Sequence, residues 1–177
     1  MTSARPFDAT KSIEILRQTP FTLSAMLGDL SPEWTASSGD TENWSPYDVV
    51  GHLIHGEETD WIPRAEIILS QDENRSFVPF DRVAQFERSK GKQLIDLLAE
   101  FAALREKNIS TLRSWDLNDG RLSLKGIHPE FGEVTLEQLL ATWVVHDLNH
   151  LRQIVSYMAR RYVDSVGPWK AYLSILS

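Results

Sequence analysis

Apolar residues recur with a helical period in four stretches of the chain, and these stretches predict its main elements. The first covers residues 10–30. Pro20 lies inside it and predicts a kink or a restart, because proline lacks a backbone donor and clashes with the preceding turn. The second covers residues 45–70 and begins with Ser45 and Pro46, a capping hydroxyl followed by a proline at the first helical position.

The third and fourth stretches are longer. Residues 82–115 carry a stripe of leucine, isoleucine and phenylalanine that predicts one long helix, with its charged residues, Arg105 among them, mostly in solvent. The fourth helix is predicted for residues 135–161. It begins with a capping box, in which the side chains of Thr135 and Gln138 each bond the other's backbone N–H.

The segments around the fourth helix carry turn residues. Before it, Leu122 and Leu124 alternate with polar neighbours and permit a very short strand. After it, a last short helix is expected over residues 169–176. No internal repeat or linker is visible, so we expect one domain over residues 1–177. Its predicted fold is all-α: a four-helix bundle with an irregular loop before the last long helix and a short C-terminal helix.

Composition narrows the range of functions. The net charge is −7 and no long basic run exists, so nucleic-acid binding is not expected. The absence of cysteine excludes disulfides, thiolate metal ligands and a cysteine nucleophile. No apolar run approaches the roughly 20 residues of a membrane span, and residues 1–6 lack the apolar core of a signal peptide. We therefore expect a cytoplasmic protein that does not enter a membrane.

Three of the five histidines stand where one metal ion could use them. His146 and His150 are one helical turn apart, so their side chains project from one face roughly 5–6 Å apart. His52, two turns into the second helix, could supply a third nitrogen from a facing surface. A histidine beside an apolar face is, however, more often a hydrogen-bonded core residue than a ligand. The pair also lacks the glutamate of the H-E-x-x-H metalloproteases, since Asp147 stands there instead.

Three motifs in this order resemble the DinB-like family, also called the damage-inducible or YfiT-like superfamily. They are Trp44-Ser-Pro-Tyr-Asp-Val-Val-Gly-His52-Leu, His128-Pro-Glu-Phe-Gly132 and His146-Asp-Leu-Asn-His150-Leu-Arg-Gln-Ile154. The resemblance extends over essentially the whole chain. It implies a divalent metal held by one histidine of the second helix and two of the last long helix. Carried over residue by residue, these ligands are His52, His146 and His150.

The other two histidines remain open. His55 follows His52 by three residues and is a candidate fourth ligand, a hydrogen-bonding partner of a ligand, or a surface residue. The surroundings of His52 match the family motif, which favours His52 as the ligand. His128 precedes a proline in a loop, where a packing or surface role is expected.

Three polar residues lie near the histidines in the sequence and are candidate partners for them. Asp147 lies about 100° around the helix from His146. It is either a partner for another ligand's free N–H or a solvated acid. Gln153 is expected to pack rather than to line a pocket. Glu57 falls off the face of His52 and is not expected in the site.

Three neutral imidazoles leave a metal ion with open positions for water or substrate. They do not choose among zinc, nickel and iron, of which zinc is expected first. Relatives in the family include bacillithiol and mycothiol S-transferases and a mycothiol-dependent maleylpyruvate isomerase. The resemblance thus implies a transferase in which the ion binds a low-molecular-weight thiol as thiolate and prepares it to attack a small-molecule electrophile.

Two alternatives remain. One is a metal-dependent hydrolase, although no general base accompanies the histidines in sequence. The other is a non-enzymatic, metal-stabilised module for stress response or interaction. A homodimer is expected through exposed apolar helix surface. No catalytic residue beyond the metal ligands is assigned.

Overall fold

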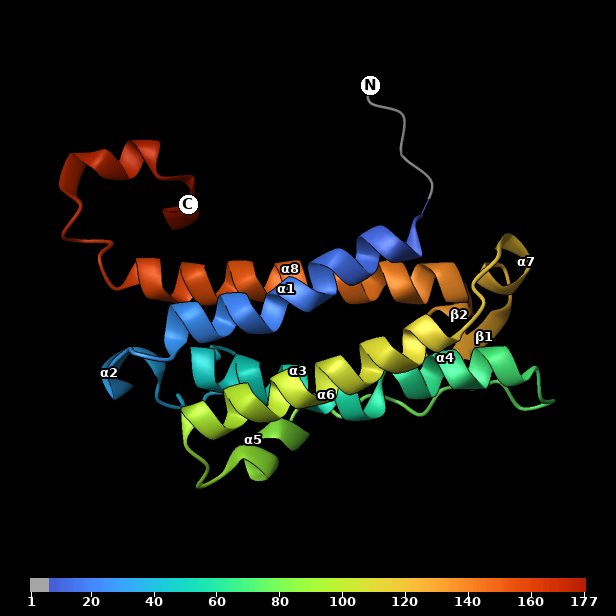
Figure 1. Ribbon diagram of the computed structural model, residues 1–177. Coiled ribbons are helices and arrows are strands. Elements are labelled where there is room, and N and C mark those ends of the chain that lie inside the picture. The colour runs from blue at the N-terminus through green and yellow to red at the C-terminus, as the bar shows by residue number, and fades with distance from the viewer. Residues whose placement is uncertain (1–6) are drawn as a thin grey trace.

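The computed structural model describes residues 7–177, and its long helices run side by side as a four-helix bundle (Figure 1). The bundle consists of α1 (Ala9–Leu27), the consecutive helices α3 (Pro46–Thr59) and α4 (Trp61–Ser70), α6 (Leu94–Ser114) and α8 (Leu136–Arg160). Both α1 and the α3–α4 pair pack against α6 and α8. The predicted all-α bundle is confirmed. Residues 1–6, where no signal peptide was expected, lie outside the described residues.

Helix α1 continues through Pro20, so the predicted restart there is wrong. Asp8 caps its first turn by accepting hydrogen bonds from the backbone N–H groups of Thr10 and Lys11. Proline at position 20 cannot donate to the carbonyl of Leu16, four residues earlier. That carbonyl instead accepts a hydrogen bond of 2.8 Å from Arg105 Nη1, which satisfies it without interrupting the helix.

The second and third predicted helices are each divided in two. Residues 45–70 form α3 and α4, which meet at Asp60, whose backbone (φ −111°, ψ −71°) departs from helical geometry. Residues 82–115 form α5 (Ala84–Ser89) and α6, and the turn between them contains Gly91 at φ +79°. Glycine adopts such left-handed geometry without a steric penalty, which explains the break there.

The irregular segment before α8 contains the short helix α7 (Asp119–Leu122) and a two-stranded antiparallel hairpin of β1 (Lys125–His128) and β2 (Gly132–Thr135). The strand expected at Leu122 and Leu124 therefore begins slightly later. Residues 75–77 bond to Ile127 of β1, which ties the loop after α4 to the hairpin. Helix α8 follows β2 directly, and its predicted capping box of Thr135 and Gln138 is confirmed.

Short elements complete the described chain. They are α2 (Pro32–Thr35) and, where a C-terminal helix was expected, two 3₁₀ helices, η1 (Gly167–Tyr172) and η2 (Ser174–Leu176). Within residues 7–177, no helix is both long enough and apolar enough to span a bilayer.

The apolar core forms two clusters, one toward each end of the bundle, with a polar layer between them. On α6, Phe101 belongs to one cluster and Ile109 to the other, and the buried Arg105 lies between them. On α8, Asp147 likewise separates Trp143 from Ile154. This layer crosses the bundle at the level of the histidines.

Candidate metal centre

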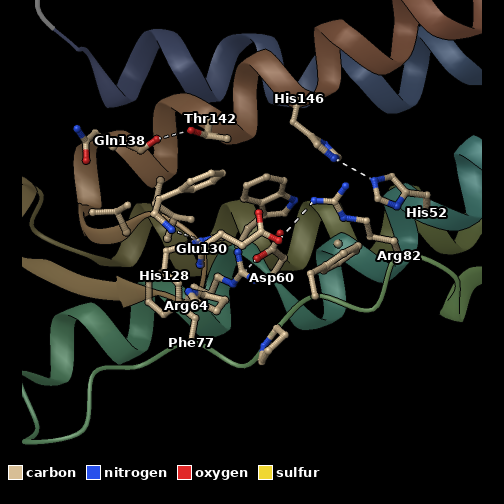
Figure 2. Close-up of a pocket in the computed structure, with 18 of the residues that line it drawn as sticks. His52, Asp60, Arg64, Phe77, Arg82, His128, Glu130, Gln138, Thr142 and His146 are labelled. Atoms are coloured by element: carbon tan, nitrogen blue, oxygen red, sulfur yellow. Dashed lines mark hydrogen bonds and ion pairs between the residues drawn. The ribbon is translucent and has the colours of Figure 1, made fainter.

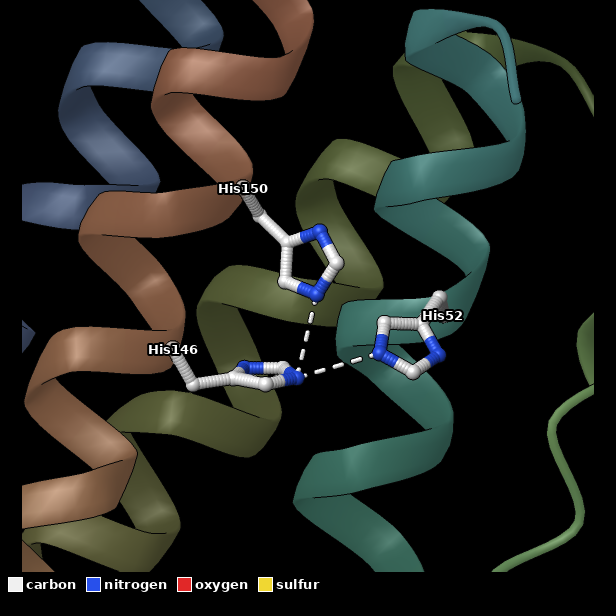
Figure 3. Close-up of side chains that lie close together, drawn as sticks. All are labelled: His52, His146 and His150. Carbon is white, nitrogen blue, oxygen red and sulfur yellow. Dashed lines mark hydrogen bonds between the residues drawn. The ribbon is translucent and has the colours of Figure 1, made fainter. Parts of the chain in front are cut away.

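The structure brings His52, His146 and His150 together across the interface between α3 and α8 (Figure 3). His146 Nε2 lies 3.1 Å from His52 Nε2 and 3.1 Å from His150 Nε2. The candidate ligand atoms of the three residues all lie within 4.8 Å of one another. The cluster includes no Asp or Glu among residues 7–177.

Burial keeps the three imidazoles uncharged. Desolvation, with the neighbouring imidazoles, lowers the pKa of His52 to about 3 and that of His146 to about 2. Desolvation also lowers the pKa of His150, opposed by its hydrogen bond to Gln153. At neutral pH each ring therefore keeps one nitrogen lone pair, as a metal ligand requires.

The converging nitrogens fit a divalent cation better than they fit each other. A neutral imidazole carries one N–H. Hydrogen bonds therefore cannot satisfy both contacts at His146 Nε2 unless Nε2 of His52 and Nε2 of His150 both donate to it. Two nitrogens each about 2.0–2.1 Å from one ion lie roughly 3.0–3.4 Å apart, which matches the two spacings of 3.1 Å at His146 Nε2. The three-nitrogen set suits zinc, nickel or iron.

The opposite ring nitrogens differ in their partners. His150 Nδ1 donates to Gln153 Oε1 at 2.8 Å, an arrangement that leaves Nε2 free for a ligand role. Gln153 does not line the cavity, as expected, and its contact with His150 is one that the i, i+3 spacing on α8 allows. Nδ1 of His52 and Nδ1 of His146 are buried without a hydrogen-bond partner among residues 7–177.

Aromatic rings surround the cluster. Trp44 packs on His52 with ring centroids 4.8 Å apart and stacks nearly parallel to His150. Phe80 meets His52 edge-on, and Trp61 does the same to His146. These rings pack against the imidazoles and restrict their orientation.

A buried ionic network lies beside the histidines. Arg105 is 1% exposed and donates to both oxygens of Asp147, at 2.6 and 3.0 Å, and to Glu57 at 2.8 Å. Glu57 also accepts from Asn108 and Trp143. The expected solvation of Arg105 is wrong, and so is the alternative that made Asp147 a solvated acid.

This network supports the histidines without entering their cluster. Asp147 directly follows His146, and Glu57 lies five residues after His52. Glu57 is outside the metal-ligand group, as expected, but it is buried rather than external. Burial raises the pKa of Glu57, and Arg105 opposes that effect.

The remaining histidines do not join the cluster. His55 is 6% exposed and packs against Phe80 with ring centroids 4.8 Å apart, so a surface role for it is wrong. His128 Nδ1 accepts from the backbone N–H groups of Glu130 and Phe131. His128 ends β1, packs on Phe131 with ring centroids 4.4 Å apart and lines the cavity, so the structure supports the packing alternative for it.

The cluster opens into a cavity of about 650 Å³ between α4, α8, the hairpin and the loop after α4 (Figure 2). Its aromatic and apolar wall and its charged residues come from segments far apart in the sequence, which sequence reasoning did not assemble. The wall comprises Trp44, Trp61, Phe77, Pro79, Phe80, Phe131, Val134 and Leu139, and the charged residues are Asp60, Arg64, Arg82 and Glu130. A cavity of this size accommodates a small organic molecule beside the three clustered histidines.

Comparisons with known proteins agree with this architecture. A model of the DinB superfamily matches residues 15–154. Among solved structures, the chain is similar to YfiT from Bacillus subtilis, with a TM-score of 0.74 and 24% sequence identity over 91% of each chain. YfiT is described as a probable metal-dependent hydrolase with an unusual four-helix bundle topology. No curated protein matches the chain.

Proposed function

The chain belongs to the DinB superfamily, and from that premise we propose that it is a divalent-metal-dependent transferase. In this proposal His52, His146 and His150 hold the ion, and a low-molecular-weight thiol is transferred to an electrophilic small molecule in the adjoining cavity. The observation that carries the proposal is the convergence of three uncharged imidazoles on the wall of an aromatic cavity.

The charge of the centre suits a thiol nucleophile. A divalent ion held by neutral ligands keeps its full charge, and it lowers the pKa of a thiol or water that it binds. The thiol proton leaves to solvent, a carbon–sulfur bond forms, and the leaving group departs with the electron pair of the bond that breaks. The aromatic wall around His52 and His146 excludes water, which would otherwise compete for the electrophile.

Transfer of a thiol fits the site better than hydrolysis, because the histidine cluster contains no carboxylate in the described chain. Asp60 is the buried acid that lines the cavity, and it lies eight residues after His52. Eight residues correspond to about 12 Å of rise along an ideal helix, so the backbone of Asp60 is distant from that of His52, and its Oδ1 lies 2.6 Å from Arg64 Nε.

Hydrolysis remains the second candidate because YfiT is described as a probable metal-dependent hydrolase. Both functions use the same metal centre and differ in the nucleophile that reaches it. A metal that only stabilises the bundle is the non-enzymatic alternative.

Cobalt-substituted protein tests the proposal. A small thiol such as cysteine should produce a thiolate-to-cobalt charge-transfer band in wild type, and no band in a folded His146→Ala variant. Conjugation of the same thiol to monochlorobimane should then exceed the rate with His146→Ala. Absence of the band together with metal-dependent cleavage of aryl esters would support the hydrolase, whereas absence of both would leave the structural role.

A further inference from the structure

Asp60 and Arg64 form a second polar feature of the cavity, away from His52 and His146 and on the side of His128 (Figure 2). Arg64 Nε lies 2.6 Å from Asp60 Oδ1, and the two residues are 7% and 9% exposed. The guanidinium of Arg64 also packs over the ring of Phe77, 5.1 Å from its centroid. The pair is thus held rigidly in the cavity wall.

Each member keeps an atom available to a ligand. Arg64 Nη2 donates to the carbonyl of Val78 at 3.3 Å. Arg64 Nε and Asp60 Oδ1 form an ion pair without hydrogen-bond geometry, and among residues 7–177 no hydrogen bond involves Arg64 Nη1 or Asp60 Oδ2. The wall therefore presents an acceptor beside a donor, both from buried charged residues.

The position of Asp60 in the fold gives it no evident structural task. It is the N-cap residue of α4, where an aspartate usually accepts a hydrogen bond from a backbone N–H. Here its side chain makes no capping bond and is directed to Arg64 and the cavity instead. Buried ion pairs often add little net stability, so the fold alone does not account for this one.

The charges of the cavity are balanced. Asp60 and Glu130 oppose Arg64 and Arg82, and Arg82 lies 3.9 Å from Glu130 across the mouth, where both are exposed. A lone carboxylate bound at the pair would meet the carboxylate of Asp60, and a lone ammonium would meet Arg64. A head group that carries a donor beside an acceptor, with no net charge, would satisfy both.

We propose that Asp60 and Arg64 bind the polar head of an elongated substrate whose aromatic or apolar body crosses the cavity toward the histidines. The head donates to Asp60 and accepts from Arg64, as a carboxamide or a zwitterionic α-amino acid does. The assignment of the reactive end to the histidines rests on the proposed function, whereas the head-group preference does not. Burial, which raises the pKa of Asp60 to about 6, is consistent with a site made for uncharged partners.

A matched ligand series tests this subsite in the full-length protein. Phenylbutyramide, homophenylalanine, phenylbutyrate and phenylbutylamine share one body and differ in the head. In NMR titrations of wild type, the amide or the zwitterion should bind at least about tenfold more tightly than both singly charged compounds, a difference of about 1.4 kcal/mol. Whichever of the two binds more tightly identifies the source of the head group.

Two double variants test whether Asp60 and Arg64 cause the head-group preference. Asp60→Leu/Arg64→Met replaces the pair with apolar groups, a change that buried ion pairs often tolerate, and should abolish the preference. The control Glu58→Leu/Arg88→Met removes an ion pair outside the cavity and should retain it. If the first variant does not fold, Asp60→Asn should raise the affinity for phenylbutyrate about tenfold, because the repelling charge is gone.

Tighter binding of a singly charged head, no detectable binding of any compound, or a preference that survives in Asp60→Leu/Arg64→Met would overturn the proposal. An unchanged phenylbutyrate affinity in Asp60→Asn would do the same. The titrations are run with and without a chelator. If the protein takes up no divalent metal even without the chelator and still shows the head-group preference, the proposed function is refuted and this subsite stands.

Discussion

The backbone carbonyl of Leu16 accepts a hydrogen bond of 2.8 Å from the side chain of Arg105. In an uninterrupted helix that carbonyl would accept from residue 20, which here is proline. Arg105 therefore supplies the hydrogen bond that Pro20 cannot give to the carbonyl of Leu16 in α1. Its other bonds reach Glu57 on α3 and Asp147 on α8, so one guanidinium on α6 joins all four helices of the bundle. Two of these helices carry the clustered histidines.

Replacing Arg105 with methionine should destabilise the protein strongly. The change leaves Glu57 and Asp147 buried without a counter-charge, a loss of about 3–5 kcal/mol in the free energy of unfolding. Urea denaturation followed by circular dichroism measures it. The triple variant Glu57→Leu/Arg105→Met/Asp147→Leu should recover much of the loss, and a near-wild-type stability of Arg105→Met would contradict this reading.

Gln153 should tune the metal affinity without supplying a ligand. Gln153→Ala removes the acceptor for His150 Nδ1 and should weaken zinc binding by about 10–100-fold. Gln153→Glu should restore or exceed the wild-type affinity, because a carboxylate is a stronger acceptor. Competition with a chromophoric chelator reports both values, and equal affinities for wild type and Gln153→Ala would exclude this role.

Stability should decline in acid. The pKa of His52 is about 3 and that of His146 about 2 in the fold, against an ordinary value near 6.5 in the unfolded chain. Between these values the unfolded state binds protons that the folded state does not. The free energy of unfolding then falls with pH by up to about 1.4 kcal/mol per unit for each histidine.

Asp60 acts in the opposite direction, because its raised pKa of about 6 lets the folded state bind a proton first. Urea titrations at several pH values, in the presence of a chelator, measure the net slope below pH 6.5. His146→Asn should reduce that slope, and an unchanged slope would show that this histidine is not held neutral.

Gly126 should not tolerate a side chain. A Cβ there would lie 2.6 Å from Phe77 Cε1 and 2.9 Å from Ile68 Cγ1, in the wall between β1 and α4. Gly126→Ala should therefore cost about 1–3 kcal/mol through overpacking. Thermal unfolding of Gly126→Ala is compared with that of Glu133→Ala, a control at an exposed position of β2. Equal melting temperatures for the two variants would show that Phe77 and Ile68 move aside for the added methyl group.

Local signals accounted for the parts of the fold that the sequence predicted correctly. Thr135 with Gln138 and Ser45 with Asp48 are contacts within one turn, so their residue types suffice to place two helix starts. Gly91 indicates the break between α5 and α6, because glycine favours such a turn. The residue type of Asp60 does not indicate the break between α3 and α4, because its departure from helical geometry depends on the packing around it.

The candidate site was predictable only in part. His146 and His150 share a helix face by spacing alone, but joining them to His52 required the family resemblance. Arg105 was misread because its charge was given more weight than its position, four residues from both Phe101 and Ile109 on the buried stripe. The cavity wall combines residues of α3, α4 and α8 with the hairpin and the loop after α4, and no local pattern encodes that assembly.

The central claim is that His52, His146 and His150 bind one divalent ion. Elemental analysis of tag-free protein, purified without a nickel column and reconstituted with zinc, tests it beside two folded variants. The account predicts close to one ion per chain in wild type and in His55→Ala, and none in His52→Ala/His146→Ala/His150→Ala. Wild type that takes up no zinc, nickel or iron, or a triple variant that keeps its ion, would contradict it.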